Sequence, residues 1–298
     1  MSEPTSNPFF DAEVATRLAG QILYSRGPVE GSVSGHHKSP HRGSSVEFSE
    51  YRNYAPGDDL RRLDWRVFGK TDRFYTKEFE AETNLRCYLV LDTSGSMGLE
   101  GPNGKRIDVA RRIASTLAYL LVRQGDAVGM TAARLGDTLE LPPKRAPSHL
   151  QLLFEHIAGL ECTGSDSLPQ AIHDLAERAR RRALIVIFSD FFSDQEALRD
   201  ALQHLRFRSH DVVVFHLLDR QELNFKFDRP VRFQDLESGA SLISEPNLVR
   251  DQYLEVFHRY LREFEASCRE IEIDYRRILT DEEIETPIAN FVIERAGR

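Results

Sequence analysis

Residues 87–98 read Cys-Tyr-Leu-Val-Leu-Asp-Thr-Ser-Gly-Ser-Met-Gly, an apolar run that ends in one carboxylate and two hydroxyls. The apolar part predicts a buried strand. Asp92, Ser94 and Ser96 follow it at alternate positions, on a turn that contains Gly95. Carboxylate and hydroxyl oxygens are hard ligands that suit Mg²⁺, which keeps several waters and takes few carboxylates. The pattern therefore predicts a cation site whose low charge leaves room for an anion from a partner.

The composition is that of an ordinary globular protein. The chain has 298 residues, 41% of them hydrophobic and 29% charged, enough for one large core. A net charge of −8 argues against a general nucleic-acid binder. The first residues lack the pattern of a signal peptide, and no run of about 18 apolar residues occurs, so we expect no membrane span and a cytoplasmic location.

The three cysteines, Cys87, Cys162 and Cys268, form an odd and widely spaced set without a Cys-x-x-Cys pair. This spacing suggests neither a zinc site nor a disulfide framework. We expect free thiols in a reducing compartment.

Three continuous runs of Val, Ile and Leu predict the centre of the sheet. They cover residues 86–91, 183–190 and 211–218, and amphipathic segments separate them. This alternation indicates an α/β fold with a doubly wound, mostly parallel sheet covered by helices on both faces. Ligands bind at the carboxyl ends of the strands in such sheets. Since Asp92 and Asp190 each end a buried run, we expect both carboxylates to join Ser94 and Ser96 at one site.

The rest of the chain is predicted to divide at residue 85. Residues 1–85 would form an N-terminal extension with a helix near residues 10–24, a polar loop at 31–45 and a charged, aromatic segment at 46–84. Residues 86–298 would form the α/β domain. Further helices are expected at residues 105–123, 148–160, 168–182, 194–207 and 248–268, and further strands at 127–135, 139–141, 231–235, 241–244 and 271–278.

The sequence around Asp92 lacks the motifs of several enzyme classes. An aspartic protease needs glycine where Ser94 stands, and an aspartyl-phosphate phosphatase needs a carboxylate there. The glycine pattern of a dinucleotide-binding fold and the Gly-x-Ser-x-Gly elbow of a hydrolase are both missing. A simpler alternative stays open, in which Ser94, Ser96 and Asp190 only cap turns.

The run from Asp92 to Ser96 resembles the metal-ion-dependent adhesion site of von Willebrand factor A domains. That family pairs Asp-x-Ser-x-Ser with a threonine on a second loop and an aspartate after the fourth strand. Asp92, Ser94, Ser96 and Asp190 match it, whereas the threonine position falls on Asp166, which would add negative charge. The resemblance implies that the serines coordinate the ion directly and that Asp92 and Asp190 do so mainly through water. A partner's Asp or Glu would complete the coordination of Mg²⁺, with Mn²⁺ or Ca²⁺ as alternatives.

Residues 47–65, from Glu47-Phe48 through Ala55-Pro56-Gly57-Asp58-Asp59 to Asp64-Trp65, are similar to the signature of the bacterial domain-of-unknown-function family 58. The likeness spans roughly residues 43–218. It implies a von Willebrand factor A-like domain preceded by a family-specific segment. It also implies an adaptor or chaperone-like role beside an AAA+ ATPase of the MoxR type.

Together these features predict a metal-ion-dependent protein-interaction module that is not an enzyme. Its partner would be an AAA+ ATPase or a client of that ATPase. One alternative is a structural scaffold with a degenerate metal site, because the threonine is missing. Another is a Mg²⁺-dependent hydrolase that uses the ion to activate water, although no general base is evident beside the site.

Overall fold

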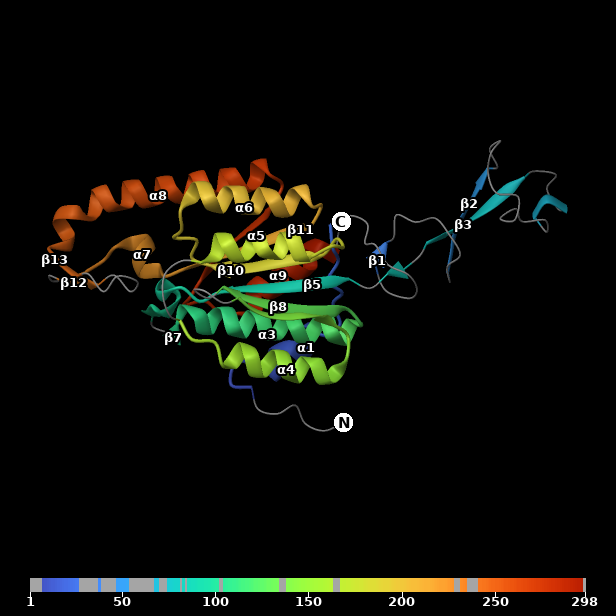
Figure 1. Cartoon of the computed structure of the whole chain (residues 1–298), viewed down its shortest axis with the longest axis horizontal. Helices are drawn as coiled ribbons and strands as arrows, with labels where there is room; N and C mark the ends of the chain where they lie inside the picture. The colour runs from blue at the N-terminus through green and yellow to red at the C-terminus, as the bar shows by residue number, and fades with distance from the viewer. Residues whose placement is uncertain are drawn as a thin grey trace. The chain divides into compact units, whose positions relative to one another are not determined.

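The computed structural model describes residues 7–26, 37–38, 47–53, 67–69, 74–80, 82–83, 85–101, 104–133, 138–162, 167–227, 231–234 and 241–296. The chain forms two compact units, one made of Met1–Tyr24 with Arg86–Arg298 and the other of Ser25–Leu85 (Figure 1). The first 24 residues thus belong with the α/β unit and not with the extension in which the sequence division placed them. Helix α1 (Ala12–Leu18) is attached there by its Arg17, whose guanidinium lies 2.6 Å from the Glu285 carboxylate.

A six-stranded sheet forms the centre of the larger unit, in the order β14-β11-β10-β5-β8-β9. All neighbouring strands are parallel except β9, which runs antiparallel to β8. The predicted doubly wound, mostly parallel sheet is therefore confirmed. The strands are β5 (Arg86–Asp92), β8 (Ala127–Ala133), β9 (Leu139–Lys144), β10 (Leu184–Ser189), β11 (Asp211–Leu218) and β14 (Asp274–Leu279).

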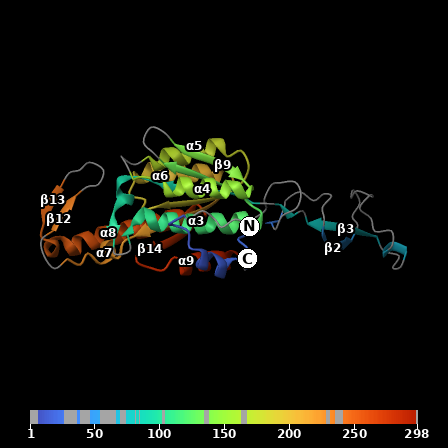
Figure 2. The same ribbon diagram turned by 90° about the horizontal axis from the view of Figure 1, so that it is seen from below.

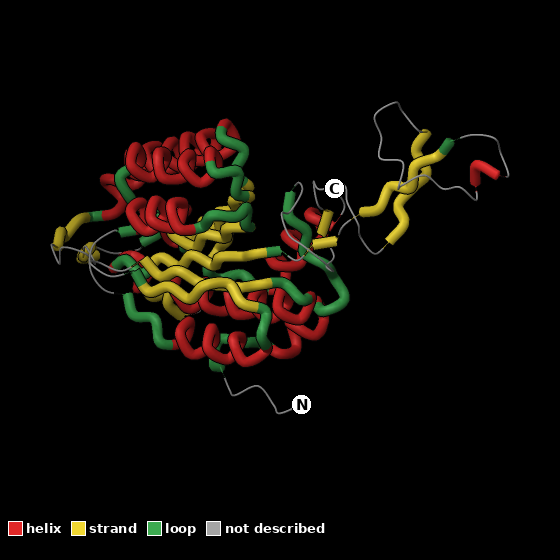
Figure 3. The backbone as a smooth tube through the Cα atoms, turned by 45° about the vertical axis from the view of Figure 1, so that its right-hand side comes forward, coloured by secondary structure: helices red, strands yellow, loops and turns green. Residues whose placement is uncertain are grey.

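Helices cover both faces of this sheet (Figures 1 and 3). On one face, alternate residues of the central strands, among them Tyr88, Val90 and Ile187, pack in one buried cluster with side chains of α5, α6 and α8. On the other face lie α1, α3, α4 and α9, and Figure 2 shows α9 beside α1. The helices are α3 (Arg106–Gln124), α4 (Pro147–Ala158), α5 (Leu168–Arg178), α6 (Gln195–Phe207), α8 (Pro246–Glu270) and α9 (Glu285–Ala296).

Short elements follow the carboxyl ends of the strands. The 3-10 turn η2 (Gly95–Gly98) and the two-residue strands β6 (Glu100–Gly101) and β7 (Gly104–Lys105) connect β5 to α3. Helix α7 (Arg220–Asn224) follows β11. The antiparallel hairpin of β12 (Val231–Gln234) and β13 (Ser241–Ser244) precedes α8 and lies at the same end of the unit as α7 (Figures 1 and 2).

The described residues of the smaller unit include two antiparallel strand pairs. Strand β2 (Glu47–Asn53) pairs with β3 (Tyr75–Glu80), and β1 (His37–Lys38) pairs with β4 (Glu82–Thr83). Residues 54–66, which carry most of the family-like signature, and most of the expected loop at 31–45 lie outside the described residues.

Two expectations about the whole chain can be compared with the structure. All three cysteines are free, as expected from their spacing. Among the described residues, no helix is both long enough and apolar enough to cross a membrane.

A buried arginine attaches α9 to the sheet. Arg295 lies 2.7 Å from the Asp211 carboxylate and 3.2 Å from that of Asp274, and all three side chains are almost fully buried. Asp211 and Asp274 begin the adjacent strands β11 and β14. Because a buried carboxylate without a partner is costly, this arginine holds α9 over the starts of both strands.

We predict that Arg295→Ala lowers the free energy of unfolding by about 3–5 kcal/mol, because it removes the buried guanidinium that compensates the carboxylates of Asp211 and Asp274. Urea unfolding followed by circular dichroism measures the change. The control is Arg269→Ala, which removes an arginine that is 80% exposed and paired only along its own helix, and which should change stability by about 0.5 kcal/mol or less. Equal effects of the two variants would contradict the anchoring role.

Candidate functional site

Asp92 is the last residue of β5, and its side chain is 2% exposed. Its Oδ1 accepts a hydrogen bond from the backbone N–H of Ser94 at 2.8 Å. Its Oδ2 accepts one from the Ser189 hydroxyl, at the end of β10, at 2.6 Å. The parallel pairing of β5 and β10, with Leu91 opposite Phe188, puts these groups side by side. The two strands are thus neighbours, as a site that includes both Asp92 and Asp190 requires.

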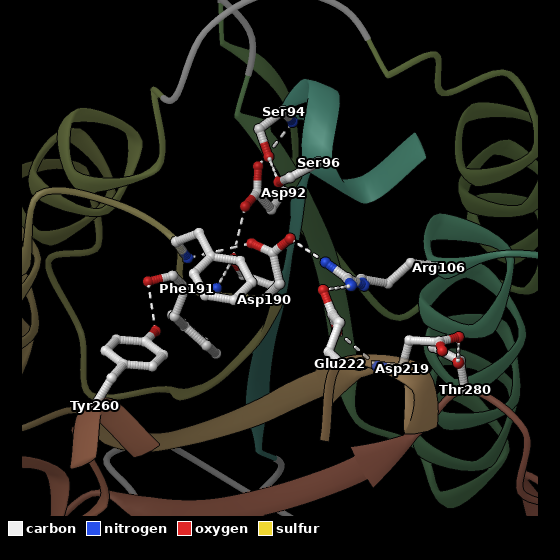
Figure 4. A network of polar contacts seen from close by, with 12 residues as sticks. Asp92, Ser94, Ser96, Arg106, Asp190, Phe191, Asp219, Glu222, Tyr260 and Thr280 are labelled. Atoms are coloured by element: carbon white, nitrogen blue, oxygen red, sulfur yellow. Dashed lines mark hydrogen bonds and ion pairs between the residues drawn. The ribbon is translucent and has the colours of Figure 1, made fainter. Parts of the chain in front are cut away.

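Ser94 and Ser96 add two hydroxyl oxygens beside this carboxylate (Figure 4). The two Oγ atoms lie 3.1 Å apart. Neighbouring ligands of an octahedral Mg²⁺ at about 2.1 Å are separated by about 2.9 Å, so this spacing suits direct coordination by both serines. Ser94 is the residue before the 3-10 turn, yet its hydroxyl makes no capping hydrogen bond to that turn. Ser94 is therefore not an N-cap of the turn, although its hydroxyl shares a hydrogen bond with that of Ser96 inside it.

Asp190 comes directly after β10, but both of its oxygens already have partners. Its Oδ1 accepts the backbone N–H of Phe192 at 3.2 Å, so part of its role is to cap a turn. Its Oδ2 forms an ion pair with the guanidinium of Arg106, the first residue of α3. Figure 4 shows the Asp190 carboxylate between the Asp92 group and Arg106.

Arg106 also binds a second carboxylate on its far side. Its Nη2 lies 2.6 Å from Oε1 of Glu222 on α7, and the arginine side chain is 2% exposed. The other oxygen of Glu222 accepts the backbone N–H of Asp219 at 2.8 Å. Asp219 caps α7 and accepts the Thr280 hydroxyl, at the end of β14, at 3.0 Å. A chain of polar contacts thus runs from the end of β10 to the end of β14.

The backbone after Asp190 has an unusual conformation. Phe191 has a φ of 54°, in the left-handed region that costs an ordinary residue about 1–3 kcal/mol. Its N–H donates to the Ser189 hydroxyl, and its carbonyl accepts the Tyr260 hydroxyl of α8, both at 2.8 Å. The conformation lets the next ring, that of Phe192, stack on Tyr260 while remaining 42% exposed.

Burial and a neighbouring charge act on the Asp92 carboxyl group. Burial is the main reason why the pKa of Asp92 is raised to about 7, and the neighbouring charge of Asp190 adds to it, against the hydrogen bonds from Ser189 and Ser94. A cation beside Asp92 would favour its charged form.

The donor set fits one hard divalent cation. Within the part of the chain that the structure describes, no three His, Cys, Asp or Glu side chains gather as a metal cluster. A metal would therefore use the Asp92 carboxylate with the hydroxyls of Ser94 and Ser96, which are the oxygen ligands that Mg²⁺ takes. Asp190 reaches the site, although Arg106 holds one of its oxygens. Asp166, the remaining predicted ligand, lies outside the described residues.

Three residues of the site were missing from the sequence-based set: Ser189, Arg106 and Glu222. One signal for Arg106 was available. A cation in the first turn of a helix is disfavoured by the helix dipole, so an arginine that begins α3 needs carboxylates nearby. Asp219 and Glu222 have the spacing of a capping box, which marks Glu222 as a helix-start residue but not as a partner of Arg106.

The sequence comparisons agree with the resemblance seen in the motifs. The family described as "Protein of unknown function DUF58" matches residues 50–260. The uncharacterized protein Rv1480 of Mycobacterium tuberculosis is 28% identical over 233 residues, which cover 77% of this chain and 73% of that protein. The uncharacterized protein YeaD of Bacillus subtilis is 28% identical over 157 residues, which cover 52% of this chain and 36% of that protein.

Solved structures with a similar fold include BatB from Bacteroides thetaiotaomicron, at a TM-score of 0.48 and 17% identity, covering 72% of this chain and 100% of that one. The SpRpn10 VWA domain has a TM-score of 0.44 and 12% identity, with 70% of this chain and 95% of that one covered. The manganese-loaded TRAP protein of Plasmodium vivax has a TM-score of 0.33 and 16% identity, with 44% and 56% covered.

The raised pKa of Asp92 predicts how stability depends on pH. The folded chain binds a proton that the unfolded chain, with an ordinary pKa near 3.9, has released, so stability should fall as the pH rises from about 4 to about 7. In the presence of a chelator, Asp92→Asn should flatten this dependence. It should also raise the free energy of unfolding at pH 8 by at least about 1.4 kcal/mol, the value of one pKa unit.

Urea unfolding at pH 5, 6.5 and 8 tests this expectation. Asp200→Asn, which changes an exposed aspartate on α6, should keep the slope of the unaltered protein. If Asp92→Asn keeps that slope as well, Asp92 is not the group responsible.

Proposed function

Since the chain belongs to the DUF58 family, we propose from its site that it is a protein-interaction module that captures a partner's carboxylate through a bound divalent cation. The supporting observation is the convergence of the Asp92 carboxylate with the two serine hydroxyls, 3.1 Å from one another, at the carboxyl edge of the sheet. Mg²⁺ is the proposed ion, with Mn²⁺ or Ca²⁺ as alternatives.

In this role the ion would be the positive charge that attracts the carboxylate of the partner. Asp92, Ser94 and Ser96 supply one negative charge between them, so a divalent ion that they hold keeps a net positive charge. An Asp or Glu of the partner would neutralise it and occupy a coordination position. The carboxyl edge of a doubly wound sheet is also where such folds place their ligands.

The contacts at the site favour binding over hydrolysis. A metal-assisted hydrolase needs a base to take a proton from the attacking water. Both oxygens of Asp92 accept hydrogen bonds, and both oxygens of Asp190 are engaged by Phe192 and Arg106. Since these carboxylates are engaged in holding the loops of the site in place, neither is free to act as a base. We propose that the protein is not an enzyme.

The proposed partner is an AAA+ ATPase of the MoxR type or a client of that ATPase, as the family resemblance implies. The exposed ring of Phe192 supports a protein ligand, because it adds apolar surface two residues from Asp190. On α8, the exposed Val256 precedes Phe257, whose ring centroid lies 6.0 Å from that of Phe192. A partner would thus find polar and apolar contacts side by side.

We predict that the double variant Ser94→Ala/Ser96→Ala loses Mg²⁺ affinity by tenfold or more, because it removes two direct ligands and changes no charge. Titration calorimetry with MgCl₂ measures this loss. Binding to the purified MoxR-type ATPase of the same organism, in Mg²⁺ and in EDTA, should show a similar loss for the variant. Ser193→Ala, in the loop after β10, is the matched control.

If ATPase binding is the same for all variants in Mg²⁺ and in EDTA, the protein is a scaffold with a degenerate site. If the unaltered protein binds Mg²⁺ but not the ATPase, the cation site stands and the partner assignment is wrong.

Phe192→Ala should weaken ATPase binding by about tenfold and leave the Mg²⁺ affinity unchanged, because the ring contacts the partner and not the ion. The control is Phe207→Ala, which removes a ring that is 86% exposed at the end of α6 and should change neither value. If the two variants bind the ATPase equally well, Phe192 is not part of the interface.

A further inference from the structure

We infer that Arg106 is a built-in counter-cation that keeps Asp190 from coordinating the ion and thereby makes the site selective for a partner with a carboxylate. This inference deepens the proposed function and rests on it. The site has two aspartates at adjacent strand ends, and yet the ion that it holds would still need an anion from a partner.

The first observation is the position of the guanidinium. Arg106 is 2% exposed and contacts Asp190 on one side and Glu222 on the other, at 2.6 Å from the latter. A buried guanidinium is costly unless carboxylates compensate it. Asp190 and Arg106 therefore compensate each other, and the Oδ2 of Asp190 faces the guanidinium (Figure 4).

The second observation is that the protein holds Arg106 in place from the far side. Glu222 accepts the N–H of Asp219 at 2.8 Å in the cap of α7, and Asp219 accepts the Thr280 hydroxyl at 3.0 Å. The carboxylate that receives Arg106 is thus fixed by α7 and by the end of β14. Glu222 thus fixes the nitrogen of the guanidinium that does not contact Asp190.

The charges then explain the selectivity. If Asp190 were free, a divalent ion at this site would meet two carboxylates and be neutralised without help. With Arg106 paired to Asp190, the ligands of the ion bring only the charge of Asp92. The ion alone should bind weakly, and a carboxylate from outside should strengthen its binding. By reciprocity, the ion strengthens the binding of the partner by the same factor.

The test measures Mg²⁺ alone, by titration calorimetry and by the shift of thermal unfolding between MgCl₂ and EDTA. Arg106→Gln should bind Mg²⁺ at least tenfold more tightly than the unaltered protein, because it frees Asp190 and removes a positive charge. Glu222→Gln should bind it no more tightly, since Arg106 then has Asp190 alone. The control Arg178→Gln removes an arginine that pairs with Glu140 at 2.9 Å and should change nothing.

Arg106→Gln leaves the buried Asp190 and the half-buried Glu222 without the guanidinium between them, so it can fail to fold. The double variant Arg106→Gln/Glu222→Gln removes one of them and should also bind Mg²⁺ at least tenfold more tightly. Equal or weaker binding by the folded arginine variant overturns the inference. Tighter binding by Glu222→Gln also overturns it, because the effect would then come from loosening the network.

These outcomes separate the inference from the proposed function. If the unaltered protein does not bind Mg²⁺ and Arg106→Gln does, Arg106 is the resident cation of Asp190 and the metal-dependent capture is wrong. If Mg²⁺-dependent capture holds and Arg106→Gln gains no affinity, the proposed function stands without this role for Arg106.

Discussion

The parallel pairing of β5 with β10 is the constraint on which the site depends. It sets Leu91 opposite Phe188, so the residues that follow both strands emerge at one edge. The Ser189 hydroxyl then reaches Asp92, and Asp190 lies close enough for its charge to raise the pKa of Asp92. A shift of the register by one residue would turn the side chains of Ser189 and Asp190 each to the other face of the sheet. The Ser189 hydroxyl would then no longer reach Asp92.

Burial of charge at this edge is balanced by a few specific contacts. Arg106 compensates Asp190 and Glu222, much as Arg295 compensates Asp211 and Asp274 at the opposite ends of the strands. The loop after β10 is held from two directions, by Arg106 on α3 and by the Tyr260 hydroxyl on α8. This support accounts for the persistence of the left-handed conformation of Phe191, which an unsupported loop would relax.

The sequence was sufficient for the sheet because its central strands are short, continuous apolar runs separated by amphipathic segments, which is typical of strands buried on both faces. The position of Asp92 and Asp190 at one edge followed from the same reasoning. Helix α9 was missed, although Ile284, Ile288, Phe291 and Val292 have helical spacing and are buried. The contacts of Arg106 could not be read from any local pattern, since they span 84 and 116 residues of sequence.

The separation of these contacts along the chain has a consequence for folding. Asp92 and Ser189 are 97 residues apart, and contacts of such long range form late, after the entropy of closing the intervening loop has been lost. During synthesis, residues Asp92 to Ser96 are made well before Ser189, the residue whose hydroxyl contacts Asp92. The site is therefore complete only when the whole α/β unit has folded.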